Sequence, residues 1–301
     1  MSHAYDTTQI RLKDLTALKE KADLFLLPDS TKKSMVGVGG AHSPFKSRGL
    51  DFQEVRVYQP GDDIRQIDWH VTAKYGKPFT KLYTEEKERC IFFVVDLREQ
   101  MQFATHGAFK SVIAARMAAF MAFIAEHQKD KIGYIILTDD GLTFSGAADN
   151  STLPTFLSNL VHPKKTDSTA DFGKVIRLLH QFLPAGAFVF FFSDFYDWHK
   201  EDTTLLAPLA EKNTFLFCFI YDQLETELPQ DSLPFSNGKE MVIVSTFDDK
   251  IRKKFHDEWA QHVASLEKIS HKYDWALLPI ATDSDYLDIF TRFCFGRGER
   301  T

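Results

Sequence analysis

The stretch FFVVDLREQM, residues 92–101, decides how the rest of the chain is interpreted. Its apolar run stops at Asp96, and the next four residues include Arg98 and Gln100. Ligands of open α/β sheets bind beyond the carboxyl ends of the strands, so a carboxylate at a strand end lies where such proteins do their chemistry. The stretch is therefore a metal site, a former metal site or a plain strand end.

Similar apolar runs continue along the chain. They are continuous rather than alternating, which is typical of strands covered on both faces, as in a parallel sheet. The runs cover residues 90–97, 131–139, 187–194, 214–222 and 274–280. Segments with helical spacing of apolar residues lie between the runs. This alternation predicts an α/β fold with a doubly wound, mostly parallel sheet over residues 90–301.

Residues 1–89 lack this alternation. A helical pattern covers 11–26, a Gly- and Ser-rich loop covers 34–49, and strand patterns cover 50–59 and 77–88. The sequence predicts an N-terminal helix and a β-rich extension that packs against the α/β domain. A polar stretch at 223–240, which precedes the strand-like MVIVST, predicts a hairpin outside the main sheet.

Composition excludes several classes of protein. The 301 residues carry a net charge of −6 and no long basic tract, so nucleic acid is not an expected partner. The longest apolar runs are too short to span a bilayer, and the first residues show no signal-peptide pattern. The three cysteines are far apart in the sequence and suit a reducing compartment. We expect a cytoplasmic protein without membrane insertion.

Acidic residues end several of the predicted strands. Asp96, Asp139 and Asp194 end three of them, and Asp222 ends a fourth. Carboxylates gathered at one edge suit a hard cation such as Mg²⁺, which takes oxygen ligands. The structural alternative is that each aspartate caps the turn or helix that follows it.

The chain from Cys90 to its end resembles the von Willebrand factor A fold. In that family a strand ends in D-x-S-x-S, a second loop supplies a Thr, and an Asp follows a later strand. The resemblance places Asp96 in the first element, Thr169 in the second loop and Asp194 after the later strand. It implies that a divalent metal, if present, is held by these three residues.

The chain departs from this pattern at both serines, which are replaced by Arg98 and Gln100. A guanidinium cannot bind a cation and is always charged. Our hypothesis is that Arg98 takes the place of the metal and pairs with Asp96 or Asp194, so no metal or cofactor is expected. In the alternative, Arg98 points into solvent and the site still binds Mg²⁺.

A second polar stretch, RVYQPGDDIRQIDW, covers residues 56–69. Pro60-Gly61 suits a type II turn, and Asp63 with Gln66 suits a capping box. Ile64 and Ile67 are then expected to face inward, with Trp69 as an apolar anchor. The simplest interpretation is a folded corner whose charges satisfy its own backbone.

The same stretch resembles the hallmark of a bacterial family, domain of unknown function number fifty-eight. The residues that carry the resemblance are Arg56, Tyr58, Gly61, Asp62, Asp63, Arg65, Asp68 and Trp69. The family has a von Willebrand A-like domain, and its members accompany MoxR-type AAA+ ATPases as adaptors in assembly or activation. The resemblance implies an extension over 1–89 that carries the motif, a von Willebrand A-like domain over 90–301, and such an ATPase as partner.

Three functions are consistent with the sequence. The first is a non-enzymatic adaptor that binds a protein through its strand ends or through the 56–69 corner. The second is a metal-dependent protein-binding domain of the same fold. The third is a metal-dependent hydrolase or nuclease that uses Asp62, Asp63 and Asp68 with the basic residues His70, Lys74 and Lys77. Adjacent aspartates face opposite ways in an extended chain, which disfavours the third function.

Overall fold

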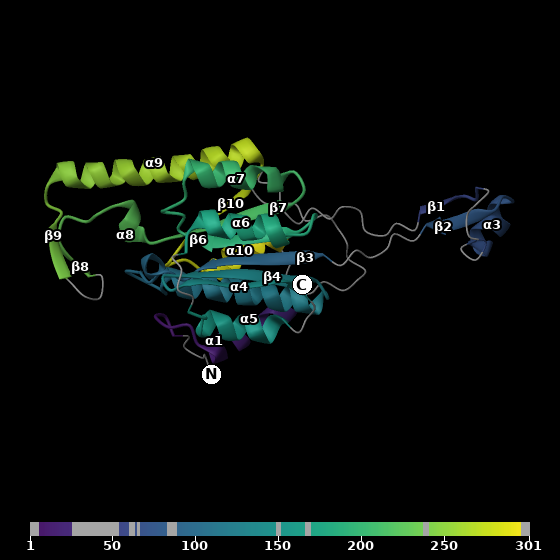
Figure 1. Ribbon diagram of the computed structural model, residues 1–301, viewed down its shortest axis with the longest axis horizontal. Helices are drawn as coiled ribbons and strands as arrows, with labels where there is room; N and C mark the ends of the chain where they lie inside the picture. The colour runs from purple at the N-terminus through teal and green to yellow at the C-terminus, as the bar shows by residue number, and fades with distance from the viewer. Residues whose placement is uncertain are drawn as a thin grey trace.

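A mostly parallel sheet with the strand order β10-β7-β6-β3-β4-β5 forms the centre of the molecule (Figure 1). The computed structural model describes residues 6–25, 54–59, 64, 67–82, 89–148, 152–165, 170–236 and 241–295. The strands of this sheet are β3 (Cys90–Asp96), β4 (Lys131–Thr138), β5 (Gly141–Ala148), β6 (Phe188–Ser193), β7 (Thr214–Tyr221) and β10 (Ala276–Ala281). All neighbouring pairs are parallel except β4 and β5, which are antiparallel.

The order of the strands creates the place where a ligand-binding site is expected. Counted along the chain, the strands of this sheet lie in the order 3-2-1-4-5-6, which is that of a doubly wound sheet. The order reverses between β3 and β6, which pair in parallel from Ile91 and Phe188 onward. Their carboxyl ends therefore meet at the topological switch point, with Asp96 on one strand and Asp194 directly after the other.

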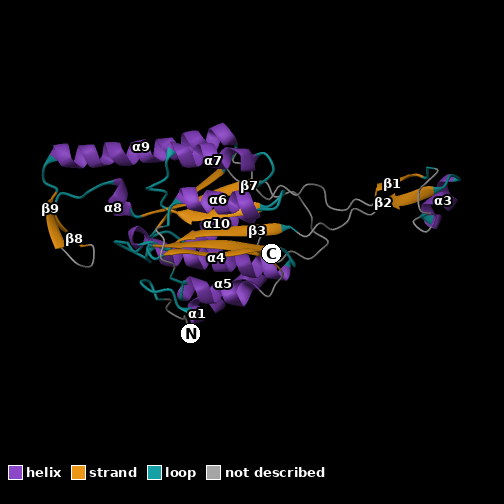
Figure 2. Ribbon diagram, viewed as in Figure 1, coloured by secondary structure: helices purple, strands orange, loops and turns teal. Residues whose placement is uncertain are grey.

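Helices cover both faces of the sheet (Figure 2). One face is covered by α1 (Leu12–Thr16), α2 (Leu18–Asp23), α4 (Lys110–His127), α5 (Thr152–Val161) and α10 (Tyr286–Phe295). The other is covered by α6 (Phe172–Phe182), α7 (Lys200–Ala210) and α9 (Asp249–Tyr273). Strand β3 divides its side chains between the two cores, with Phe93 in the first and Phe92 in the second.

Helix α4 lies at the centre of the first layer. Every residue from Lys110 to Ala125 is buried, so the helix has no solvent-facing stripe of the kind that an amphipathic pattern predicts. The cause is the N-terminal segment, since α2 packs along α4 while α1 contacts both α4 and α5. A charged side chain on α4 must therefore find its partner inside the protein.

The predicted fold class is confirmed: the protein is an α/β protein with a doubly wound, mostly parallel sheet. The predicted strand runs correspond to β3, β4, β6, β7 and β10. Strand β5 was not predicted, because its Gly-, Ser- and Ala-rich sequence lacks a strong apolar pattern. Within the described residues, no helix is both long and apolar enough to cross a membrane.

A small unit carries the 56–69 motif. It consists of β1 (Glu54–Val57), α3 (Trp69–Tyr75) and β2 (Phe79–Leu82), with β1 and β2 antiparallel as the strand patterns predicted. We expected the whole N-terminal region to pack against the α/β domain. Helices α1 and α2 do so, whereas Figure 1 shows the β1–α3–β2 unit apart from the main sheet. With two short strands and a seven-residue helix, the unit has little apolar core of its own.

A second unit projects beyond the carboxyl ends of the strands (Figure 1). After β7 the chain forms the short helix α8 (Gln223–Thr226), then a hairpin of β8 (Ser232–Ser236) and β9 (Met241–Ser245), and then enters α9. The hairpin is a separate two-stranded sheet, as the sequence predicted. It is joined to the domain through α8 and α9.

Gly107, in the loop before α4, provides a test of how the strand ends are packed. Its φ of +80° favours glycine, and a Cβ there would lie 2.0 Å from the backbone oxygen of Thr282. We expect Gly107→Ala to lower the free energy of unfolding by roughly 2–4 kcal/mol in chemical denaturation. Gly186→Ala is the matched control, because Gly186 has a φ of +85° with open space around it, and should cost only about 1 kcal/mol. Equal costs for the two changes would contradict the packing described here.

Candidate functional site at the carboxyl ends of the strands

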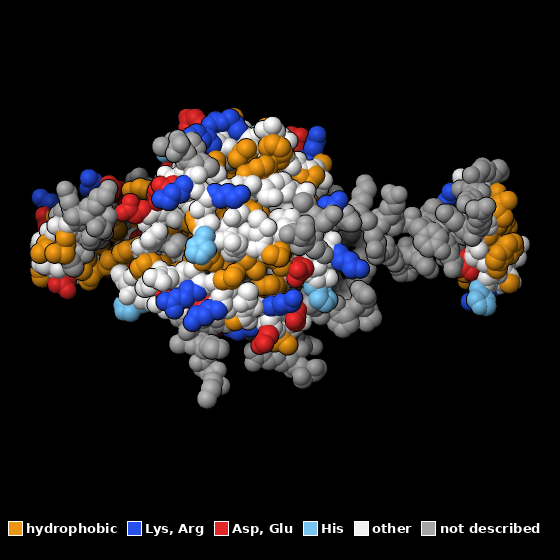
Figure 3. Space-filling model, turned by 60° about the horizontal axis from the view of Figure 1, so that its bottom comes forward, with side chains coloured by type: hydrophobic (Ala, Val, Ile, Leu, Met, Phe, Trp, Pro, Cys, Tyr) orange, Lys and Arg blue, Asp and Glu red, His pale blue; other side chains and the backbone are white. Residues whose placement is uncertain are grey.

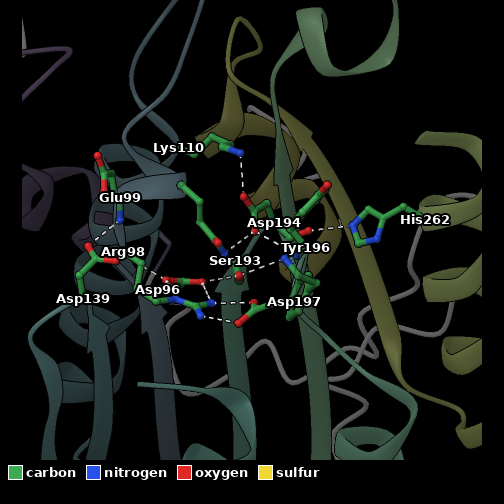
Figure 4. A network of polar contacts seen from close by, with 12 residues as sticks. Asp96, Arg98, Glu99, Lys110, Asp139, Ser193, Asp194, Tyr196, Asp197 and His262 are labelled. Atoms are coloured by element: carbon green, nitrogen blue, oxygen red, sulfur yellow. Dashed lines mark hydrogen bonds and ion pairs between the residues drawn. The ribbon is translucent and has the colours of Figure 1, made fainter. Parts of the chain in front are cut away.

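The site lies where β3 and β6 end side by side (Figure 4). Asp96 ends β3, Ser193 ends β6, and Asp194 follows directly. Asp96 is fully buried, and the Ser193 hydroxyl donates a hydrogen bond of 2.7 Å to its Oδ2. The two predicted carboxylates therefore belong to one buried polar group at the switch point.

Arg98 turns back onto the end of its own strand. Its Nε donates to Asp96 Oδ1 at 2.9 Å and its Nη2 donates to Asp96 Oδ2 at 2.6 Å, a bidentate ion pair. The opposite side of the guanidinium binds Asp197, with Nη2 2.9 Å from Oδ1. Phe172, the first residue of α6, lies under the guanidinium with its ring centroid 5.2 Å from Cζ. Arg98 is only 7% exposed and is held by two carboxylates and an aromatic ring.

Asp194 has a cation of its own. The ammonium of Lys110, at the first position of α4, lies 2.8 Å from Asp194 Oδ2 and 2.6 Å from Glu225 Oε1. Lys110 is 1% exposed. The amide of Gln100 donates to Asp194 Oδ1 at 3.2 Å. Of the two partners proposed for Arg98 from the sequence, Asp96 is the one observed, and Lys110 neutralises Asp194 instead.

The carboxylates also cap the turns that follow the strands, as the structural alternative predicted. Asp96 Oδ1 accepts from the backbone N–H of Arg98, and Asp194 Oδ1 accepts from that of Tyr196. Between these turns Phe195 is buried with a φ of +53°, an uncommon conformation for a bulky residue. That conformation is consistent with a loop fixed by its hydrogen bonds and packing.

Burial and charge act in opposite directions on these groups. Burial raises the pKa of the Asp96 carboxyl, whereas the hydrogen bonds and charge of Arg98 and the hydrogen bond from Ser193 lower it in part. The four hydrogen bonds that its two oxygens accept fit the ionised form. Burial also opposes ionisation of Asp197 and Lys110. Arg98 nevertheless lowers the pKa of Asp197, and Asp194 with Glu225 raises that of Lys110.

The residues do not fit a resident divalent metal. The guanidinium of Arg98 contacts Asp96 and the ammonium of Lys110 contacts Asp194, and neither cationic group can act as a ligand. Gln100 directs its amide N–H, not its oxygen, at Asp194. Across the described ranges, no three His, Cys, Asp or Glu side chains are grouped so that they could hold a metal ion. Thr169, the expected third ligand, lies outside the described residues.

The other two strand-end aspartates have separate roles. Asp139 accepts a hydrogen bond from the backbone N–H of Glu99 at 2.8 Å. Asp222 is fully buried and binds the hydroxyls of Thr105 and Thr282 while capping α8 through Leu224 N–H. Asp222 thereby joins the ends of β7 and β10 to the loop before α4.

The structure describes only some residues of the 56–69 motif. Gly61, Asp62, Asp63 and Arg65 lie outside the described residues, as does the proposed capping box. Arg56 is in β1, and the backbone N–H of Tyr58 donates to the Pro78 carbonyl at 2.8 Å. Asp68 is the N-cap of α3 and accepts from the N–H groups of His70 and Val71.

Two expectations for this corner were wrong. Trp69 is 67% exposed and Ile64 is 64% exposed, whereas the sequence pattern predicted that both face inward. Trp69 is the first residue of α3, and this position leaves its indole in solvent. The apolar anchor is thus an exposed side chain.

Three residues of the strand-end network were missed from the sequence: Lys110, Asp197 and Glu225. Lys110 begins a segment in which nearly every position is apolar or small, and a lysine in such a helix signals a buried carboxylate partner. Asp197 and Glu225 gave no comparable signal, because their contacts with Arg98 and Lys110 join residues about a hundred positions apart.

Comparisons with known proteins agree with the hallmark stretch. Residues 54–265 match the family described as “Protein of unknown function DUF58”. “Uncharacterized protein Rv1480” of Mycobacterium tuberculosis and “Uncharacterized protein Mb1516” of Mycobacterium bovis are each 25% identical over 295 residues, which covers 94% of this chain and 92% of the relative. The crystal structure of conserved hypothetical protein BatB from Bacteroides thetaiotaomicron aligns with a TM-score of 0.44 and 12% identity, over 68% of this chain and 96% of that chain.

Replacing Arg98 with Met tests the central ion pair. The change leaves Asp96 buried without its cation, so we expect the free energy of unfolding at neutral pH to fall by about 3–5 kcal/mol. Urea denaturation measures it. Lys165→Met, which breaks an exposed pair with Asp140, is the control and should change stability little.

The pH dependence of this loss has a defined sign. In the wild type, Arg98 lowers the pKa of Asp197 against the effect of burial. The stability from this ion pair is therefore complete at both about pH 5 and about pH 7.5, and is lost only at lower pH. In the Arg98→Met variant, protonation of Asp96 relieves the uncompensated charge. The gap between the two proteins should therefore be smaller at about pH 5 than at about pH 7.5. A gap that widens on acidification would contradict the assignment.

Proposed function

This chain belongs to the family described as “Protein of unknown function DUF58”, and on that premise we propose that it is a non-enzymatic protein-binding module that serves as an adaptor. The proposed partner is a MoxR-type AAA+ ATPase in the bacterial cytoplasm, and the proposed role is the assembly or activation of a client. The choice of this partner rests on the family resemblance of the 56–69 stretch.

Exposed apolar side chains on the two projecting units carry the proposal. On the β1–α3–β2 unit, Trp69 is 67% and Tyr75 62% exposed. On the hairpin unit, Met241 is 68% and Ile243 66% exposed, and Phe247 follows at 61%. Figure 3 shows hydrophobic side chains gathered at both ends of the molecule. Large apolar groups clustered on projecting elements are typical of protein-binding surfaces.

The strand-end network supports a binding role over a catalytic one. Its buried carboxylates already hold cationic side chains, and a carboxylate saturated with hydrogen bonds is a poor general base. In the motif, Asp68 is engaged as the cap of α3, so it is not directed at a substrate. The role of Asp68 as the cap of α3 therefore gives no support to a hydrolase site that uses Asp68 and His70.

Affinity for the purified ATPase tests the proposal. The wild-type chain should bind it in biolayer interferometry, and at least one of two double variants should bind about tenfold more weakly. One variant is Trp69→Ala with Tyr75→Ala, and the other is Met241→Ser with Ile243→Ser. Both remove exposed side chains, so their melting temperatures should stay close to that of the wild type.

Leu205→Ser is the matched control, because Leu205 is an exposed apolar residue of α7 outside both projecting units. It should leave the affinity unchanged. Absence of wild-type binding would contradict the proposed partner. Binding that neither double variant weakens would contradict the proposed surfaces.

A further inference from the structure

The strand-end network contains two cationic side chains and four carboxylates. Arg98 holds Asp96 and Asp197, and Lys110 holds Asp194 and Glu225. Each cation therefore holds one deeply buried and one partly exposed carboxylate. For Arg98 these are Asp96, with its side chain 0% exposed, and Asp197, 31% exposed. For Lys110 they are Asp194, 8% exposed, and Glu225, 28% exposed. The uncompensated negative charge therefore lies toward solvent, where it costs least.

We infer that Arg98 and Lys110 together replace one divalent cation, and that the protein keeps a latent metal site which these two side chains fill. The two side chains supply a charge of +2, the same as Mg²⁺ or Mn²⁺, to the same pair of buried carboxylates. The Ser193 hydroxyl oxygen also lies at this site, in contact with Asp96. Removal of both cations leaves an oxygen-rich group of the kind that hard divalent ions bind, with water completing the shell.

Because Arg98 and Lys110 are part of the chain, their ion pairs also hold neighbouring elements together, which an exchangeable ion would not do permanently. Lys110 belongs to α4 and Glu225 to α8, so their ion pair ties the root of the hairpin unit to the end of β6. His262, about halfway along α9, lies with Nε2 3.0 Å from the Asp194 carbonyl and donates to it in this geometry. The loop after β6 is thus joined to α8 through Lys110 and to α9 directly, and these contacts involve only protein side chains and backbone.

Thermal unfolding in the presence and absence of a divalent ion tests the inference independently of any partner. The full chain is compared with EDTA and with about 5 mM Mg²⁺ or Mn²⁺, at ionic strength matched with NaCl. For the wild type we expect melting temperatures within about 1 °C of each other. For the double variant Arg98→Met with Lys110→Met we expect a lower melting temperature in EDTA and a recovery of at least about 3 °C with the ion.

The matched control is Lys19→Met with Lys165→Met, which also removes two positive charges but from exposed pairs. It should respond to the ion no more than the wild type does. If the Arg98 and Lys110 variant is unfolded in EDTA, circular dichroism with and without the ion gives the same reading, because an ion that fits restores the helix signal. The single variant Lys110→Met provides a milder case for the same measurement.

Two results would overturn the inference. One is stabilisation of the wild type by the ion comparable to that of the double variant, which would mean that the site already takes a metal. The other is a double variant and a Lys110→Met variant that both lack any ion response beyond that of the control.

Discussion

The ion pair between Asp96 and Arg98 is the interaction on which the strand-end region depends. A fully buried carboxylate needs a compensating charge, and Arg98, two residues further along the chain, supplies it through two side-chain hydrogen bonds. The other edge of the guanidinium then fixes Asp197, and with it the loop after β6. One side chain thus joins the ends of the two strands that flank the switch point of the sheet.

The fold explains why the second cation comes from α4. Lys110, the first residue of α4, is buried, and its ammonium lies between Asp194 after β6 and Glu225 of α8. Asp194 lies next to it because β3 and β6 are neighbours, and Glu225 lies there because α8 follows β7 directly. The long-range topology, not the local sequence, brings these charges together, and it divides them into two pairs that each have a buried and a solvent-facing member.

The sequence predicted the sheet well and the site in part. Continuous apolar runs located five strands of the sheet, and the D-x-R-x-Q departure at Asp96 indicated that Arg98 pairs with a buried carboxylate. Lys110 was missed because its buried partner Asp194 lies 84 residues away in the sequence, and only the fold brings the two side chains together. Trp69 was expected to be an apolar anchor because its side chain is large and apolar, whereas here it begins a short helix and faces solvent.

The strand-end site supplies its own positive charge through Arg98 and Lys110. Isothermal titration calorimetry of the wild-type chain with Mg²⁺ and with Mn²⁺ tests it most directly. We expect no binding heat beyond dilution at concentrations up to about 1 mM, because Arg98 and Lys110 occupy the positions of the cation. Micromolar binding that Asp96→Ala abolishes would contradict it.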